Sequence, residues 1–64
     1  MITKDIIKVE QKKDGIYLSA ATPKNNYGQY YNTTNPVRPS FVPDIETAKQ
    51  KFMDFYNWFE KSED

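Results

Sequence analysis

The sequence predicts an α+β fold, in which a three-stranded antiparallel β-meander is followed by one C-terminal amphipathic helix packed on one face of the sheet (β-β-β-α). Three observations lead to this prediction. An Asp-Gly pair lies between two segments of alternating apolar residues, a segment rich in strand formers follows a second turn, and the last third of the chain repeats apolar residues at helical spacing. The 64 residues suffice for a single small domain, residues 1–64. Because the chain contains no cysteine for disulfides, aromatic packing or self-association must stabilise it.

The first two strands are expected over about residues 4–11 and 16–22, on either side of Asp14-Gly15. An Asp-Gly pair favours a two-residue type I′ turn, because both central positions of that turn need positive φ. The turn predicts a register of four pairs: Lys13 with Ile16, Gln11 with Leu18, Val9 with Ala20, and Ile7 with Thr22. Side chains alternate between the two faces of a strand, so one face receives the set Ile7, Val9, Ile16, Leu18, Ala20 and Thr22.

A third strand is expected over about residues 28–34, after a turn at residues 23–26 that begins with Pro23. The segment Gly-Gln-Tyr-Tyr-Asn-Thr-Thr is rich in strand formers, and a third strand would stabilise a hairpin that is marginal alone. A proline-rich crossover follows over residues 35–43. Pro36, Pro39 and Pro43 remove amide donors, so we expect an extended connection that is not a central strand.

An amphipathic helix is expected over about residues 45–61, with Asp44 as its N-cap and the acidic Glu46 in its first turn. Its apolar residues recur at helical spacing and form one stripe: Ile45, Ala48, Phe52, Phe55, Tyr56 and Phe59. We expect the three phenylalanines to fill the hollows above the small residues of the sheet. The helix and one sheet face would then form a single core.

The residue types exclude most catalytic chemistry. The chain has neither histidine nor cysteine, the residues that supply the commonest general bases, soft nucleophiles and zinc ligands. Its two glycines form no phosphate-binding loop, and its acidic residues lack the spacing of a calcium-binding loop. We therefore expect a protein without enzymatic activity, metal or cofactor. The absence of a long apolar run and of a signal-like N-terminus predicts a cytoplasmic protein without a membrane span.

Two features indicate a surface that binds another protein. Tyr27, Tyr30 and Tyr31 lie in a segment rich in tyrosine and asparagine, a composition favoured in binding loops. The alternative is that these tyrosines cover the edge of the core. Trp58 lies about 100° from the centre of the helical stripe. This position fits either an exposed binding anchor or a side chain folded over the core rim against the crossover.

The opposite face of the sheet is a candidate for contacts with nucleic acid. Lys8, Lys12 and Tyr17 are expected on this face, with Lys13 and Lys24 at the turns and Arg38 on the crossover. The alternative is an ordinary solvated sheet surface, since Glu10 shares the face. The net charge of the chain is zero, but residues 1–43 hold six cations and three carboxylates, whereas residues 44–64 hold three cations and six carboxylates.

These observations lead to two hypotheses about function. The first is a small non-catalytic protein-interaction module, an accessory protein of a phage or mobile element that modulates a host protein. The excess of lysine over arginine, eight to one, fits a source with AT-rich codons. The second is a nucleic-acid-binding domain that uses the open sheet face. A homodimer through Trp58 and Met53 is a third arrangement, in which any function belongs to the dimer.

Overall fold

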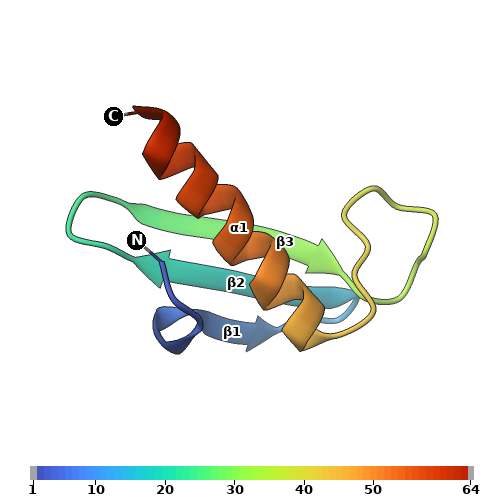
Figure 1. Cartoon of the computed structure of the whole chain (residues 1–64). Coiled ribbons are helices and arrows are strands. Elements are labelled where there is room, and N and C mark those ends of the chain that lie inside the picture. Colours follow the sequence, from blue (N-terminus) through green and yellow to red (C-terminus); the bar gives the residue numbers. More distant parts are fainter. Residues whose placement is uncertain (1, 64) are drawn as a thin grey trace.

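The computed structural model describes residues 2–63, which fold into a three-stranded open sheet and one long helix (Figure 1). The strands are β1 (Lys8–Gln11), β2 (Gly15–Ala21) and β3 (Asn26–Asn32), and they lie antiparallel in the order β1-β2-β3. The helix α1 (Ile45–Glu63) crosses one face of the sheet diagonally and leaves the other face open. The predicted β-β-β-α arrangement is confirmed.

The hairpin between β1 and β2 has a different turn from the predicted one. Its register pairs Lys8 with Ser19, Val9 with Leu18, Glu10 with Tyr17 and Gln11 with Ile16. Lys13 and Asp14 therefore form the loop, and the N–H of Lys12 donates to the Gly15 carbonyl at 2.8 Å. No residue in the described part of the chain has positive φ, so the predicted type I′ turn is wrong. The register differs from the prediction by two residues. Because side chains alternate with a period of two, each keeps its predicted face.

Gly15 belongs to β2 rather than to the turn because β3 pairs with it. Gly15 lies opposite Asn32, and the Asp14 carbonyl accepts a hydrogen bond from the N–H of Thr33 at 3.1 Å. A Cβ at position 15 would lie 2.9 Å from Asn32 Cα and against the carbonyl of Tyr31. The close approach of the neighbouring strand, not a positive φ, is therefore what requires glycine here.

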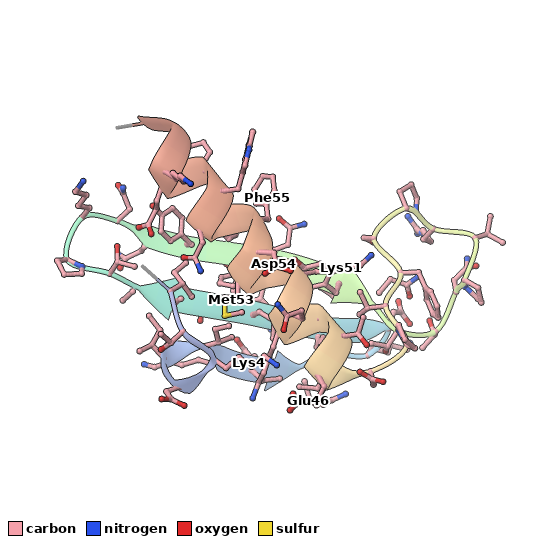
Figure 2. All side chains as sticks on the ribbon, in the orientation of Figure 1. Lys4, Glu46, Lys51, Met53, Asp54 and Phe55 are labelled. Carbon is pink, nitrogen blue, oxygen red and sulfur yellow. The ribbon has the colours of Figure 1, made fainter. Side chains whose placement is uncertain are left out.

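The chain before β1 also differs from the prediction. The expected strand is wrong over Lys4–Ile6, which form a single 3-10 turn, η1. Ile2 and Ile7, on either side of this turn, are both buried in the core. Asn57 of α1 holds the Ile2 backbone at two points: the Ile2 N–H donates to Oδ1 at 2.7 Å, and Nδ2 donates to the Ile2 carbonyl at 2.9 Å. An exposed ion pair of 3.7 Å between Lys4 and Glu46 joins the same segment to the first turn of α1 (Figure 2).

The proline-rich crossover is folded rather than extended, contrary to the prediction. The Arg38 N–H donates to the Asn35 carbonyl and the Phe41 N–H to the Arg38 carbonyl, both at 3.1 Å, so two turns follow each other beside the end of the sheet (Figure 1). The buried Asn32 organises this loop. Its Nδ2 donates to the Asn35 carbonyl at 2.6 Å, and its Oδ1 accepts from the N–H groups of Thr34 and Asn35. Phe41 then forms one parallel bridge with Asn32, which leads the chain back to the core.

Asp44 caps α1 as predicted. Its Oδ1 accepts from the Thr47 N–H at 2.7 Å, and its carbonyl accepts from the Ala48 N–H at 3.1 Å. The Thr47 N–H, together with the Thr47 hydroxyl, holds the pKa of the Asp44 carboxyl below its usual value. Behind this cap the helix and the sheet share one core, which contains Ile2, Ile7, Ile16, Leu18, Ala20, Tyr31, Val42, Ala48 and Phe52.

The buried side of α1 is rotated away from the predicted stripe. Ala48 and Phe52 are fully buried, but Phe55 and Phe59 are exposed. The expectation that all three phenylalanines fill the core is therefore wrong for Phe55 and Phe59. Asn57 contacts the N-terminal segment and Met53 packs against the core, whereas Phe55 projects from another side of α1 (Figure 2).

Candidate functional site

Three aromatic side chains are exposed on the C-terminal half of α1. Phe55 is 52% exposed, Trp58 63% and Phe59 38%. The C-terminal end of α1 extends past β3 (Figure 1). The rings of Phe55 and Trp58 lie 6.2 Å apart, and the edge of Tyr56 packs against Phe55 at a centroid distance of 5.0 Å. We call Phe55, Trp58 and Phe59 the aromatic helix surface.

A groove of about 320 Å³ lies between β3 and α1 at the base of this surface. Gln29 and Tyr31 line it from the sheet, and Lys51 and Phe55 line it from the helix. Two aromatic rings thus form the walls, while the lysine places a positive charge at the rim. A site of this composition suits an apolar side chain that lies next to a carboxylate.

Tyr27 and Tyr56 fill the space beside the aromatic helix surface. Their ring centroids lie 4.5 Å apart. The Tyr27 hydroxyl donates to Glu60 Oε2 at 3.2 Å, and the Tyr56 hydroxyl donates to the Gly28 carbonyl at 3.1 Å. Burial raises the pKa of the Tyr56 hydroxyl, and the charge of Tyr17 adds to the rise. These contacts fix the helix to β3 and occupy a backbone acceptor on that strand.

The four residues predicted to bind a protein partner lie in three different environments. Tyr31 is buried and lines the groove; burial raises the pKa of its hydroxyl, with a smaller effect from Tyr56. Tyr27 packs on Tyr56 and is half-buried, so these two predicted residues serve mainly to cover the core. Tyr30 points to the open face of the sheet. Trp58 is exposed beside Phe55, so it is not folded over the core rim.

The open face carries two tyrosines that lie across glycines of the neighbouring strand. Tyr17 and Tyr30 are direct partners in the β2–β3 register, and they are 37% and 38% exposed. A Cβ at Gly28 would lie 2.8 Å from Tyr17 Cζ, and a Cβ at Gly15 would lie 2.8 Å from the Tyr30 hydroxyl. The outer end of each tyrosine side chain therefore lies over a glycine of the adjacent strand instead of standing away from the sheet. We call these two tyrosines and two glycines the tyrosine platform.

The predicted basic residues border this platform without forming a dense cluster. Lys8 shares the open face with Tyr17, because the register places both outward. Lys12 is paired with Glu10 on the same strand edge, at 3.0 Å. Lys13 lies in the first hairpin turn and Lys24 in the second, so they are at opposite ends of the sheet.

Arg38 lies in the crossover loop and approaches the platform from its end. It lines a cleft of about 260 Å³ together with Asp14, Tyr30, Asn32 and Ser40. The cleft joins one cation, one carboxylate and one platform tyrosine. Arg38 and Tyr30 therefore line the same cleft, although Tyr30 was predicted from the sequence to bind a protein partner.

The uneven distribution of charge along the sequence corresponds to a difference in charge between the sheet layer and the helix layer of the molecule. Residues 2–43, which form the sheet and its loops, carry six cations and three carboxylates. Residues 44–63, which form α1 and its cap, carry three lysines and five carboxylates. The open face therefore has the more positive surroundings, and the helix side has the more negative ones.

Sequence reasoning missed several residues of both surfaces. Phe55 and Phe59 were assigned to the core, and Gln29 and Lys51 were not among the predicted site residues. A signal for the tyrosine platform was present: Gly-x-Tyr occurs twice, as Gly15-Ile16-Tyr17 and as Gly28-Gln29-Tyr30. When two such segments pair antiparallel with their tyrosines opposite, each tyrosine becomes diagonal to the glycine of the other strand.

Comparison with known protein families, with curated proteins and with solved structures found nothing that matches this chain. The described part of the chain has no helix with both the length and the hydropathy of a membrane span.

Proposed function

We propose that this protein is a non-catalytic protein-interaction module and that the aromatic helix surface binds its partner. The exposure of Phe55, Trp58 and Phe59 on one side of α1 carries this proposal. Given that an aromatic side chain can bury ~150–250 Å², the three side chains together present roughly 300 Å² to solvent. Contiguous apolar patches of this size are often functional, and tryptophan is enriched among the residues that dominate binding energy.

The groove beside this surface indicates the chemistry of the partner. Phe55 and Tyr31 would enclose an apolar side chain, and Lys51 would pair with a carboxylate next to it. Phe55 is backed by the edge of Tyr56, and Tyr56 is in turn fixed to Gly28. The groove is therefore already formed before binding, which lowers the entropy lost when a partner docks.

The proposal includes the cytoplasmic location and the role as a phage or mobile-element accessory that modulates a host protein. The support comes from the composition of the chain. The eight-to-one ratio of lysine to arginine fits a source with AT-rich codons, and the lack of histidine and cysteine favours a role without catalysis. Residues 44–63 carry three lysines and five carboxylates, so basic residues of the partner outside the groove would meet complementary charge.

Affinity capture with three matched baits tests the proposal. The wild-type protein and the double variant Tyr17→Ala/Tyr30→Ala should retain the same partner from a lysate of the native cell. The double variant Phe55→Ala/Trp58→Ala should lose it, because truncation of a central aromatic anchor commonly costs ~2 kcal/mol or more of binding free energy. Once the partner is purified, titration calorimetry should show at least a tenfold weaker affinity for that variant.

Equal retention of the partner by both double variants would rule out the aromatic helix surface. Circular dichroism of each bait shows that a lost partner does not reflect unfolding. Light scattering of the wild-type protein distinguishes a second copy from a different partner: a dimer that becomes monomeric in Phe55→Ala/Trp58→Ala would assign the surface to self-association.

A further inference from the structure

The open face of the sheet presents flat aromatic surface rather than ordinary solvated side chains. Tyr17 reaches from β2 across to Gly28 on β3, and Tyr30 reaches from β3 across to Gly15 on β2. Gly15 is buried even though its position faces outward, and both the backbone of β3 and the Tyr30 hydroxyl lie close to it. The outer ends of both tyrosine side chains thus lie over glycines of the neighbouring strand, and each residue remains more than one-third exposed.

Glycine is necessary for this arrangement at both positions. A Cβ at position 28 would collide with the Tyr17 hydroxyl and lie 2.8 Å from its Cζ. Any other residue there would force Tyr17 to stand away from the sheet. The same two-residue spacing in both strands places two partly exposed tyrosines opposite each other in the centre of the face. Such rings can stack with flat ring systems of a ligand.

The charged residues around these two tyrosines favour a negatively charged ligand. Five cations lie on the open face or in the loops that border it: Lys8, Lys12, Lys13, Lys24 and Arg38. Two carboxylates lie among them, Glu10 beside Lys12 and Asp14 in the cleft with Arg38. The balance is positive, and it contrasts with the negative balance of the helix on the other face.

We propose that the open face binds single-stranded nucleic acid. Two bases stack on Tyr17 and Tyr30, and the sugar-phosphate backbone passes Lys8 on one side and Arg38 at the end of the sheet. A single strand fits better than a duplex, because only unpaired bases can turn their flat faces to an aromatic side chain. This site is on the opposite side of the sheet from the aromatic helix surface, so it does not depend on the proposed protein partner.

Fluorescence anisotropy with labelled oligothymidylate and oligouridylate of about 12 nucleotides tests this proposal. We expect binding that weakens as salt increases, with a slope that falls by roughly 0.7 in Arg38→Gln, because one phosphate contact is lost. Replacing Tyr17 or Tyr30 by Ala should weaken binding roughly five- to hundredfold each, the range measured for a lost base-stacking contact. Tyr17→Phe keeps the ring and should bind as the wild type does.

Three further variants separate the loss of base stacking from effects on folding and from effects of the other side of the molecule. Tyr17→Leu and Tyr30→Leu retain an apolar cover over the glycines while removing the ring, so a folded variant that still loses affinity supports stacking. Trp58→Ala changes the other side of the molecule and should leave the affinity unchanged. A wild-type protein that produces no anisotropy change with either oligonucleotide at low salt would overturn the proposal. Binding that depends on Arg38 but not on either tyrosine would overturn it as well.

Discussion

The two faces of this sheet are built from alternate residues of the same strands, yet one face is buried under the helix and the other is open to solvent. On the covered face Ile16, Leu18 and Ala20 are buried under the helix. On the open face Tyr17 and Tyr30 cover two glycines and remain more than one-third exposed. The covered face is completed within the chain, because α1 supplies its second layer. The open face receives no second layer among the described residues, and aromatic side chains shield only the backbone beneath them.

Because of this difference, we expect the covered face to determine the stability of the fold and the open face to be available for contacts with other molecules. A small core supplies no more than ~3–5 kcal/mol of net stability, so the covered face has little tolerance for lost contacts. Side chains of the open face and of the exposed half of α1 contribute less to the fold and are free to meet other molecules. Substitutions on the two faces should therefore differ strongly in their effects.

The largest expected effect follows from removing the central aromatic of the covered face. Phe52 is fully buried, and Phe52→Ala should cost about 3–5 kcal/mol through lost burial and a cavity. That cost is comparable to the whole stability of the domain, so the variant should be largely unfolded by circular dichroism. Phe55→Ala is the matched control one turn away and should cost less than about 1 kcal/mol. Equal destabilisation by both would mean that Phe55 is also a core residue.

The second expected effect is a difference in stability between alanine substitutions at the two glycines of the tyrosine platform. Gly15→Ala should destabilise the protein by about 1–3 kcal/mol, because its Cβ would meet the backbone of β3. Gly28→Ala should cost less, since its Cβ meets the outer end of the exposed Tyr17 side chain, which can swing away. Urea unfolding measures both values. A larger loss in Gly28→Ala than in Gly15→Ala would show that the Tyr17 ring cannot move.

The third expected effect concerns the orientation of the helix on the covered face. Asn57 makes two hydrogen bonds with the Ile2 backbone, and a net ~0.5–1.5 kcal/mol is typical of each such bond. Asn57→Ala should therefore lower the free energy of unfolding by roughly 1–3 kcal/mol. Asn57→Asp keeps the acceptor for the Ile2 N–H but loses the donor, so its loss should be smaller or similar. No change in either variant would indicate that burial of Ile2 alone holds the N-terminal segment.

The smallest expected effect is a pH dependence at the start of α1. The pKa of Asp44 is lowered in the folded state, so the carboxylate stabilises the fold above its unfolded pKa of ~3.9, and this contribution is lost as pH falls through the folded pKa. Asp44→Asn keeps a good N-cap that does not titrate. The thermal stability of the wild type relative to this variant should therefore fall by a few degrees between about pH 7 and about pH 2.5. A difference that stays constant with pH would exclude the charged cap.

The elements and their faces were predictable because they rest on local signals. Period-2 alternation in β1 and β2, and the 3.6-residue period after Asp44, do not depend on contacts between distant residues. The predicted turn was wrong, yet the predicted faces of the hairpin were correct, because the register differs by two residues and two is the period of the strand. The local preference of Asp-Gly lost to the pairing of Gly15 with Asn32, which lies far along the chain.

The candidate surfaces were only partly predictable. Trp58 was identified from its helical angle, but the side of α1 that meets the rest of the molecule also includes Asn57, which contacts Ile2 55 positions away, and Phe55 is exposed. Tyr17 and Arg38 were identified from residue type, whereas the association of Tyr30 with them needed the register of β3.

The sequence by itself determined which residues alternate, where the helix begins and that the charge divides near residue 43. The tertiary structure decided the strand register, the rotation of α1 and therefore which aromatic side chains remain outside. Period and capping act over a few neighbouring residues, whereas register and rotation depend on which distant surfaces fit together once the chain has closed on itself.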